Sequence, residues 1–185
     1  MATATEIRIA PGSYTADPVH SNVTFTVRHF GAGKFRGSFA DAAATLDVGE
    51  SGELQLEGKV QVASVQVKEP QLAGHLKSPD FFDAERFPEI SFRSVEIEVG
   101  ADGKLEVEGD LTIKATTKRV HATGELTYLA ADPYGNARVG VELATDIDRT
   151  EYGVDFAAEL PGGVPVAGKE VTLIAELELI KPTEA

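Results

Sequence analysis

Four histidines and one arginine are the side chains of this chain best suited to bind a metal, move a proton or hold an anion. The histidines are His20, His29, His75 and His121, and no two of them stand four residues apart. Because that spacing is what brings two histidines to one metal on a helix, we predict no metal site. A histidine can also act as a base near neutral pH, and Arg149 can hold a carboxylate or another anion.

Motifs for covalent or nucleotide chemistry are absent from the sequence. Ser21 follows His20 directly, but neighbouring strand residues point to opposite faces, so the two cannot form a nucleophile and base pair. The chain has no cysteine, and it contains no GxSxG, P-loop or GxGxxG pattern. We therefore predict no cofactor. An enzyme that uses His29 or His75 as a base, with Arg149 stabilising an anion, remains an alternative, although a salt bridge to a neighbouring acid is the simpler interpretation of Arg149.

Alternation of apolar and polar residues predicts the elements that position these side chains. In residues 19–30 one face carries Ser21, Val23, Phe25, Val27 and His29, and the opposite face is polar. His20 falls on the polar face, where we expect it to be solvated. Similar alternation predicts strands at residues 34–48, 53–67, 89–99, 104–113, 118–129, 137–147 and 169–180.

These strands and their short connections predict one all-β domain. Eight antiparallel strands can close into a barrel that holds a small ligand, and a sandwich is the alternative architecture. The segment 69–87 is too long for a hairpin turn, and Ser78-Pro79 resembles a helix start, so we expect a short helix around residues 79–84. The domain should span residues 11–182, with residues 1–10 and 183–185 as flexible termini.

Composition and charge limit the classes of partner that we expect this chain to bind. The 185 residues include 30 acidic and 17 basic side chains, for a formal net charge of −13, so a nucleic-acid partner is not expected. No apolar run approaches the roughly 20 residues of a membrane-spanning helix, so we expect no stable membrane insertion. The N-terminus shows no basic and apolar export signal, and a cytoplasmic location is the resulting expectation.

Four motifs, in order along the chain, carry a resemblance to a known family. Residues 17–29 (DPVHSNVTFTVRH) resemble the opening D-x-x-H-S strand of the YceI-like, polyisoprenoid-binding family, and residues 75–83 (HLKSPDFFD) with 87–94 (FPEISFRS) resemble its most characteristic stretch. Residues 109–118 (GDLTIKATTK) and 148–154 (DRTEYGV) resemble its two later motifs. Each motif alone is weak, but four in the right order are a specific signal.

Three positions depart from the family pattern. Tyr14 stands where tryptophan is common, Gly74 precedes His75 where aspartate is common, and Ala115 replaces a turn glycine. The missing aspartate puts in doubt a polar role shared with His75. None of the three changes removes a cavity wall.

The resemblance implies a lipocalin-like barrel that holds a long isoprenoid, isoprenoid quinone or similar lipid, often as a homodimer, and that carries this ligand without catalysis. Apolar inner faces make this credible, because each CH₂ buried in such a lumen is worth about 0.8 kcal/mol. Leu72, Leu76, Phe81 and Phe82 could form a lid at one end. The predicted ligand-binding residues, by strand face and motif position, are Ser21, Val23, Phe25, Val27, His29, Leu72, His75, Leu76, Phe81, Phe82, Phe92, Leu111, Ile113, Leu143, Ile147 and Arg149. A ligand-free interaction or stress-response module would instead have a barrel filled by its own side chains.

Overall fold

The computed structural model describes residues 7–182, and most of these lie in strands. The main sheet consists of β1 (Gly12–Ala16), β2 (Asn22–His29), β3 (Gly33–Phe39), β4 (Ala42–Val48), β5 (Leu54–Gln61), β6 (Val65–Gln66), β7 (Glu89–Val99), β8 (Lys104–Ile113), β9 (Thr116–Leu129), β10 (Ala137–Asp148) and β13 (Ala167–Lys181). A separate hairpin pairs β11 (Glu159–Leu160) with β12 (Val164–Pro165). The helical elements are α1 (Pro70–Lys77) and the 3-10 turns η1 (Val62–Ser64) and η2 (Arg149–Tyr152).

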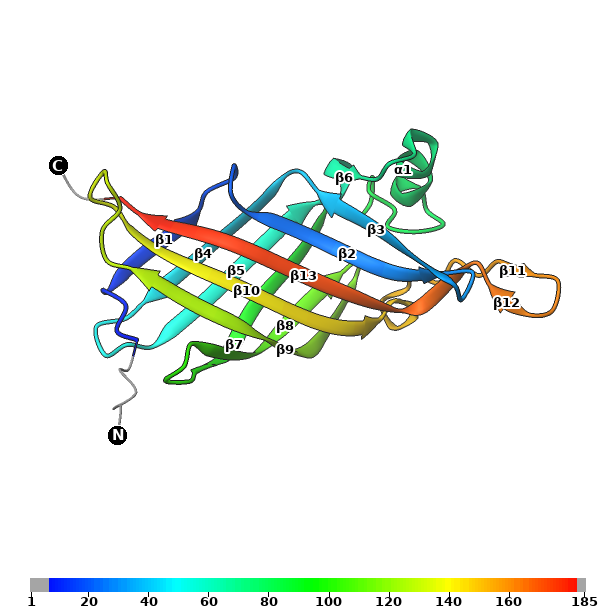
Figure 1. Cartoon of the computed structure of the whole chain (residues 1–185). Coiled ribbons are helices and arrows are strands. Elements are labelled where there is room, and N and C mark those ends of the chain that lie inside the picture. Colours follow the sequence, from blue (N-terminus) through cyan, green and yellow to red (C-terminus); the bar gives the residue numbers. More distant parts are fainter. Residues whose placement is uncertain (1–6, 183–185) are drawn as a thin grey trace.

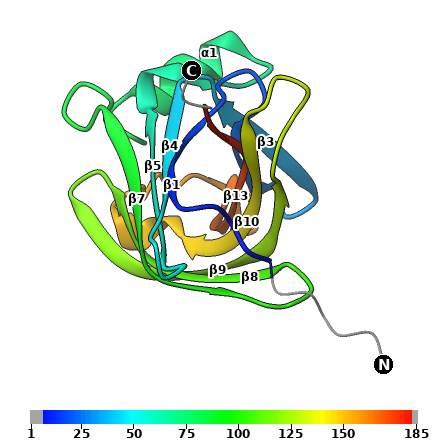
Figure 2. The same ribbon diagram turned by 90° about the vertical axis from the view of Figure 1, so that its left-hand side faces the viewer.

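Eight antiparallel strands close into a barrel, which confirms the predicted fold class (Figures 1 and 2). Their order is β1, β4, β5, β7, β8, β9, β10 and β13, and the ring closes because β13 pairs back onto β1. β8 shows why the sequence forms such strands: Leu105, Val107 and Leu111 face inward and are buried, whereas Glu106 and Glu108 face solvent. Period-two alternation therefore gives each strand one apolar face toward the lumen.

The long strand β13 makes the two ends of the barrel different. Its residues 179–180 pair with β1, whereas residues 167–176 pair with β2. At one end β1 thus completes the ring, and at the other end the β2–β3 hairpin takes its place beside β13. β6 extends that hairpin by pairing with β3, and α1 contacts β6 beside it (Figure 1).

The helix lies earlier in the chain than predicted. Residues 79–84 form turns, and the helix is α1 at Pro70–Lys77. Pro70 occupies its first turn, and the Glu69 side chain accepts a hydrogen bond from the Gln71 N–H. Ser78 is the C-terminal cap. Ser78-Pro79 therefore ends a helix, because the residue before a proline disfavours helical geometry.

Strand boundaries also differ from the prediction at the N-terminal side. The predicted strand 34–48 is two strands, β3 and β4, which are separated by a turn at residues 40–41, and the predicted strand 53–67 is divided by η1. β1 is an additional strand. Of the termini predicted to be flexible, residues 1–6 and 183–185 lie outside the described residues, whereas Ile7 and Ile9 pack against the core.

The end of the barrel closed by β1 is filled by its own side chains. Tyr14, Leu46, Val107, Val139 and Leu179 are all at most 1% exposed there. The Tyr14 hydroxyl donates to the Ala10 carbonyl over 2.8 Å, so its burial leaves no unpaired polar group. Among the described residues no helix is long and apolar enough to span a bilayer.

Candidate functional site

The other half of the barrel is hollow and contains a cavity of about 360 Å³. Its walls come from the inward faces of the strands, from α1 with the turn after it, and from the start of β13. Ala44, Leu56, Ala122 and Leu177 belong both to its lining and to the packed core, so this cluster forms the floor. The lining is almost entirely aliphatic and aromatic, which suits a hydrocarbon ligand.

Two glycines help to keep the cavity open. Phe25 lies opposite Gly37 on β3, and a Cβ at Gly37 would lie 2.4 Å from the Phe25 ring. A Cβ at Gly109 on β8 would lie 2.3 Å from the Phe92 ring. Because both glycines lack a side chain, the two large rings can lie against the barrel wall. We infer that this arrangement keeps their bulk out of the lumen.

All sixteen residues predicted to bind a ligand lie in the lining of this one cavity. Ligand binding by these residues stays a prediction, but the structure does bring them together. The sequence analysis missed further lining residues, most of which lie on the inward faces of strands. They are Phe35, Phe39, Val60, Ile90, Val120, Phe156, Val171 and Leu173. Strand parity in the predicted segments would have found most of them, whereas Phe156 lies in a loop with no periodic signal.

Aromatic rings and a histidine surround the part of the cavity next to α1. The His75 ring meets the Phe81 ring edge-on at 5.0 Å and the Phe156 ring at 5.3 Å. Its Nε2 lies 3.1 Å from an Asp80 carboxylate oxygen, so one nitrogen is already hydrogen-bonded. His29, at the end of β2, lines the same cavity and is exposed. Both imidazoles are therefore placed at the margin of an apolar space.

Arg149 is 9% exposed and donates hydrogen bonds to four backbone carbonyls. Its acceptors are Gly168, Val154, Phe156 and Ala167, at 2.5 to 3.1 Å. The expected salt bridge is absent: no carboxylate of the described residues forms an ion pair with this guanidinium. Carbonyls of the loop before β13 and of the first two residues of β13 occupy its donors instead. Burial lowers the pKa of Arg149, while the nearby charge of Asp148 opposes that shift.

Within residues 7–182 the geometry does not assemble an activated nucleophile. Ser21 accepts a hydrogen bond from the Glu178 N–H at 3.1 Å, so its oxygen is bound to the backbone of β13. No hydroxyl of the described residues hydrogen-bonds to a ring nitrogen of His29 or His75. The cavity can therefore exclude water and enclose an apolar molecule, but it presents no activated attacking group.

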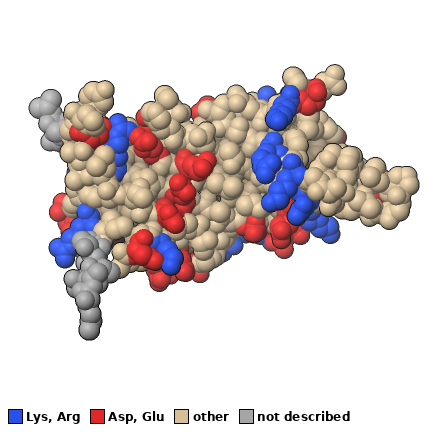
Figure 3. All heavy atoms as spheres, in the orientation of Figure 1, with Lys and Arg blue, Asp and Glu red and all other residues tan. Residues whose placement is uncertain are grey.

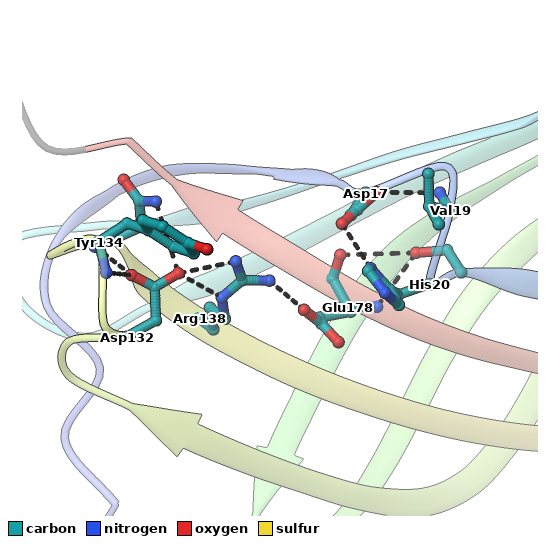
Figure 4. Close-up of polar contacts among 9 residues, drawn as sticks. Asp17, Val19, His20, Asp132, Tyr134, Arg138 and Glu178 are labelled. Carbon is teal, nitrogen blue, oxygen red and sulfur yellow. Dashed lines mark hydrogen bonds and ion pairs between the residues drawn. The ribbon is translucent and has the colours of Figure 1, made fainter.

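A polar cluster lies outside the cavity, where β1, β10 and β13 meet the β1–β2 turn (Figure 4). Asp17 accepts from the His20 Nδ1 at 2.7 Å, and Arg138 bridges Asp132 and Glu178. Asp17, His20 and Glu178 each offer one possible metal-ligand atom, and these three atoms lie within 4.8 Å of one another, a spacing that could hold a metal ion. The guanidinium of Arg138 neutralises Glu178, however, so ion pairing accounts for the cluster. His20, with a side chain 59% exposed, is solvated as expected.

The sequence matches the YceI-like domain over residues 14–179. Nearly the whole chain is covered, so the protein belongs to the YceI-like family. A UPF0312 protein of Staphylococcus aureus is 30% identical over 169 residues, which are 90% of this chain and 96% of that protein.

Solved structures show the same fold at lower sequence identity. Burkholderia cenocepacia BcnA superposes with a TM-score of 0.73 at 19% identity, covering 90% of this chain and 99% of that one. A polyisoprenoid binding domain from Saccharophagus degradans gives 0.68 at 14% identity, over 91% and 98% of the two chains. The Campylobacter jejuni YCEI protein gives 0.69 at 23% identity, over 80% and 85%.

Proposed function

We propose that this protein is a non-catalytic carrier of a long-chain apolar lipid, with a polyisoprenoid or isoprenoid quinone as the favoured class. The observation that carries the proposal is the hollow, apolar half of a barrel whose other half is densely packed. A ligand-free interaction module would need no such lumen. The relationship to a polyisoprenoid binding domain from Saccharophagus degradans supports the choice of ligand class.

The chemistry of the lining suggests how a lipid would be held. Each methylene transferred from water into the cavity is worth about 0.8 kcal/mol, so affinity should rise with the length of the chain until the lumen is full. His29 and His75 lie at the cavity margin, where a polar head group can hydrogen-bond to an imidazole. Arg149 has little free donor capacity, so we assign it to positioning the wall and not to gripping an anion.

The direct test is native mass spectrometry of the protein purified gently from its own host, followed by lipid extraction. We expect one long-chain isoprenoid or quinone per chain. A parallel titration uses geranylgeraniol and a saturated alcohol of equal length as probes. Protein that is always empty and takes up neither probe would refute the carrier function.

An enzyme acting on a lipid is the second candidate, since two histidines border the cavity. His29→Gln separates the two functions, because an enzyme should lose turnover while a carrier has none to lose. A cytoplasmic location and a homodimer are further proposals, to be tested by cell fractionation and by sedimentation velocity.

A further inference from the structure

The hairpin β11–β12 projects from the hollow end of the barrel (Figure 1). It exposes apolar side chains to solvent. Leu160 and Val164, one on each strand, are 40% and 39% exposed. Phe30, in the turn between β2 and β3, is 41% exposed, and its neighbour Gly31 faces Val164, since a Cβ there would lie 3.9 Å from the Val164 side chain. We call Phe30, Leu160 and Val164 the apolar tip. Large apolar side chains gathered at one end of a soluble chain are a mark of an interaction site.

The apolar tip is a built structure and not three scattered residues. The Phe30 N–H donates to the Val166 carbonyl over 3.1 Å, which ties the β2–β3 turn to the residue that joins β12 to β13. Phe30 holds a positive φ of 52°, a conformation that is unfavourable for a bulky residue. The surrounding contacts thus keep an aromatic ring at the surface at some conformational cost, which is typical of functional positions.

Basic side chains border the apolar tip on the outer face of β2 and β3. Arg28 and Lys34 lie directly opposite each other in the strand register, and Arg36 is the next outward residue of β3. Like charges in this position repel each other, and none of the three forms an ion pair with the described residues. Figure 3 shows this concentration of Lys and Arg over β2 and β3, on a chain whose net charge is −13. Asp155 and Glu159 are the acidic residues of the adjacent loop and hairpin.

The apolar tip is continuous with the cavity. Val166 follows the hairpin directly, and its side chain and that of Phe156 line the lumen. His29, the neighbour of Phe30, lines the lumen from the β2 side. The apolar tip is therefore adjacent in sequence and in space to residues that line this end of the cavity.

We propose that the apolar tip and the basic group Arg28, Lys34 and Arg36 dock this end of the barrel onto a lipid bilayer that contains anionic head groups. The three apolar side chains would enter the interface while the basic group meets the negative surface. Docking would place the hollow end of the barrel against the membrane, where a lipid can be exchanged. This role rests on the proposed carrier function, but binding to vesicles can be measured without any cargo.

The test is co-sedimentation of the full chain with vesicles of phosphatidylcholine and phosphatidylglycerol in equal parts, compared with vesicles of phosphatidylcholine alone. We expect binding to the mixed vesicles that weakens as salt screens the charges. Each basic residue near an anionic surface strengthens binding roughly fivefold, so the triple variant Arg28→Gln, Lys34→Gln, Arg36→Gln should bind roughly a hundredfold more weakly. The charge control is Lys104→Gln at the opposite end of the barrel.

Apolar variants provide an independent readout. Leu160→Ser with Val164→Ser should reduce vesicle binding at least tenfold, whereas Leu129→Ser, which is 51% exposed at the packed end, should not. Phe30→Asn removes the ring, and asparagine adopts positive φ more readily. We therefore expect weaker docking without loss of thermal stability, which a purely structural role of Phe30 would not produce.

Several outcomes would overturn the docking surface. The first is equal binding to both vesicle types, and the second is equal binding by the triple and control variants. The third is the absence of vesicle binding together with conversion of a stable dimer to a monomer by the triple variant, which would make this face a self-association interface. If the wild type takes up geranylgeraniol but binds no vesicle, docking fails while the carrier function stands. If it binds mixed vesicles but takes up no lipid, the carrier function fails and docking stands.

Discussion

Filling the cavity from its wall tests whether the lumen holds the ligand. Ala175 faces inward on β13, between Leu173 and Leu177, and lines the cavity. It is partly exposed because it borders open space. In Ala175→Phe the added phenyl group should occupy the volume of about four ligand methylenes, at about 0.8 kcal/mol each. The expected loss is about 3 kcal/mol of binding free energy, or roughly a hundredfold in Kd.

The same substitution should not destabilise the empty protein, because the ring enters space that is already present. We expect an increase in unfolding free energy of about 1 kcal/mol by urea denaturation. The control is Thr123→Phe, an exposed position on β9, which should leave the Kd for geranylgeraniol unchanged. An unchanged Kd in Ala175→Phe would show that the lipid binds elsewhere. A destabilisation beyond about 2 kcal/mol would show that the wall is packed as tightly as an ordinary core.

Further substitutions follow from the same contacts. Gly37→Ala should push the Phe25 ring into the lumen and weaken geranylgeraniol binding several-fold, since the new Cβ would lie 2.4 Å from that ring; unchanged binding would contradict the role given to this glycine. Leu179→Ala at the packed end should lower the unfolding free energy by about 3–5 kcal/mol in urea titrations, and a cost below about 1 kcal/mol would show that this half is also loose. Arg149→Met should cost about 3 kcal/mol and speed amide hydrogen exchange in residues 154–168, and unchanged exchange there would refute its positioning role. The pKa of His20 is raised above 6.5, chiefly by its hydrogen bond to Asp17. The His20–Asp17 pair therefore stabilises the folded protein below pH 6.5, and this contribution is lost as the pH rises through the raised pKa. His20→Gln should flatten the pH dependence of the unfolding free energy in that window, and an unaltered slope would refute the assignment.

Much of the cavity wall could be predicted because strand parity is a local property. Once Val23 and Phe25 are placed on an inward face, every second residue of the strand must share that face. The family motifs then identified His75 and the turn after it as part of the same site. This combination was sufficient to select sixteen residues that prove to line one cavity.

The position of the helix could not be settled in the same way. Glu69-Pro70 and Ser78-Pro79 both place a polar residue before a proline, and local preference favours serine over glutamate as the residue that caps a helix start. The structure chooses the first, where the Phe82 N–H then bonds to the Leu76 carbonyl and the turn folds back over the helix end. Arg149 is similar, because its acceptors are backbone carbonyls, which have no residue-specific signature in the sequence.

The sequence by itself determined the fold class, the inward face of most strands and the family, because alternation and ordered motifs are written residue by residue. Only the tertiary structure decided that one half of the barrel is packed and the other hollow. That difference arises because β13 is bordered by β1 at one end and by the β2–β3 hairpin at the other. It also arises because Phe25 and Phe92 lie over glycines of other strands, and such distant juxtapositions leave no periodic trace along the chain.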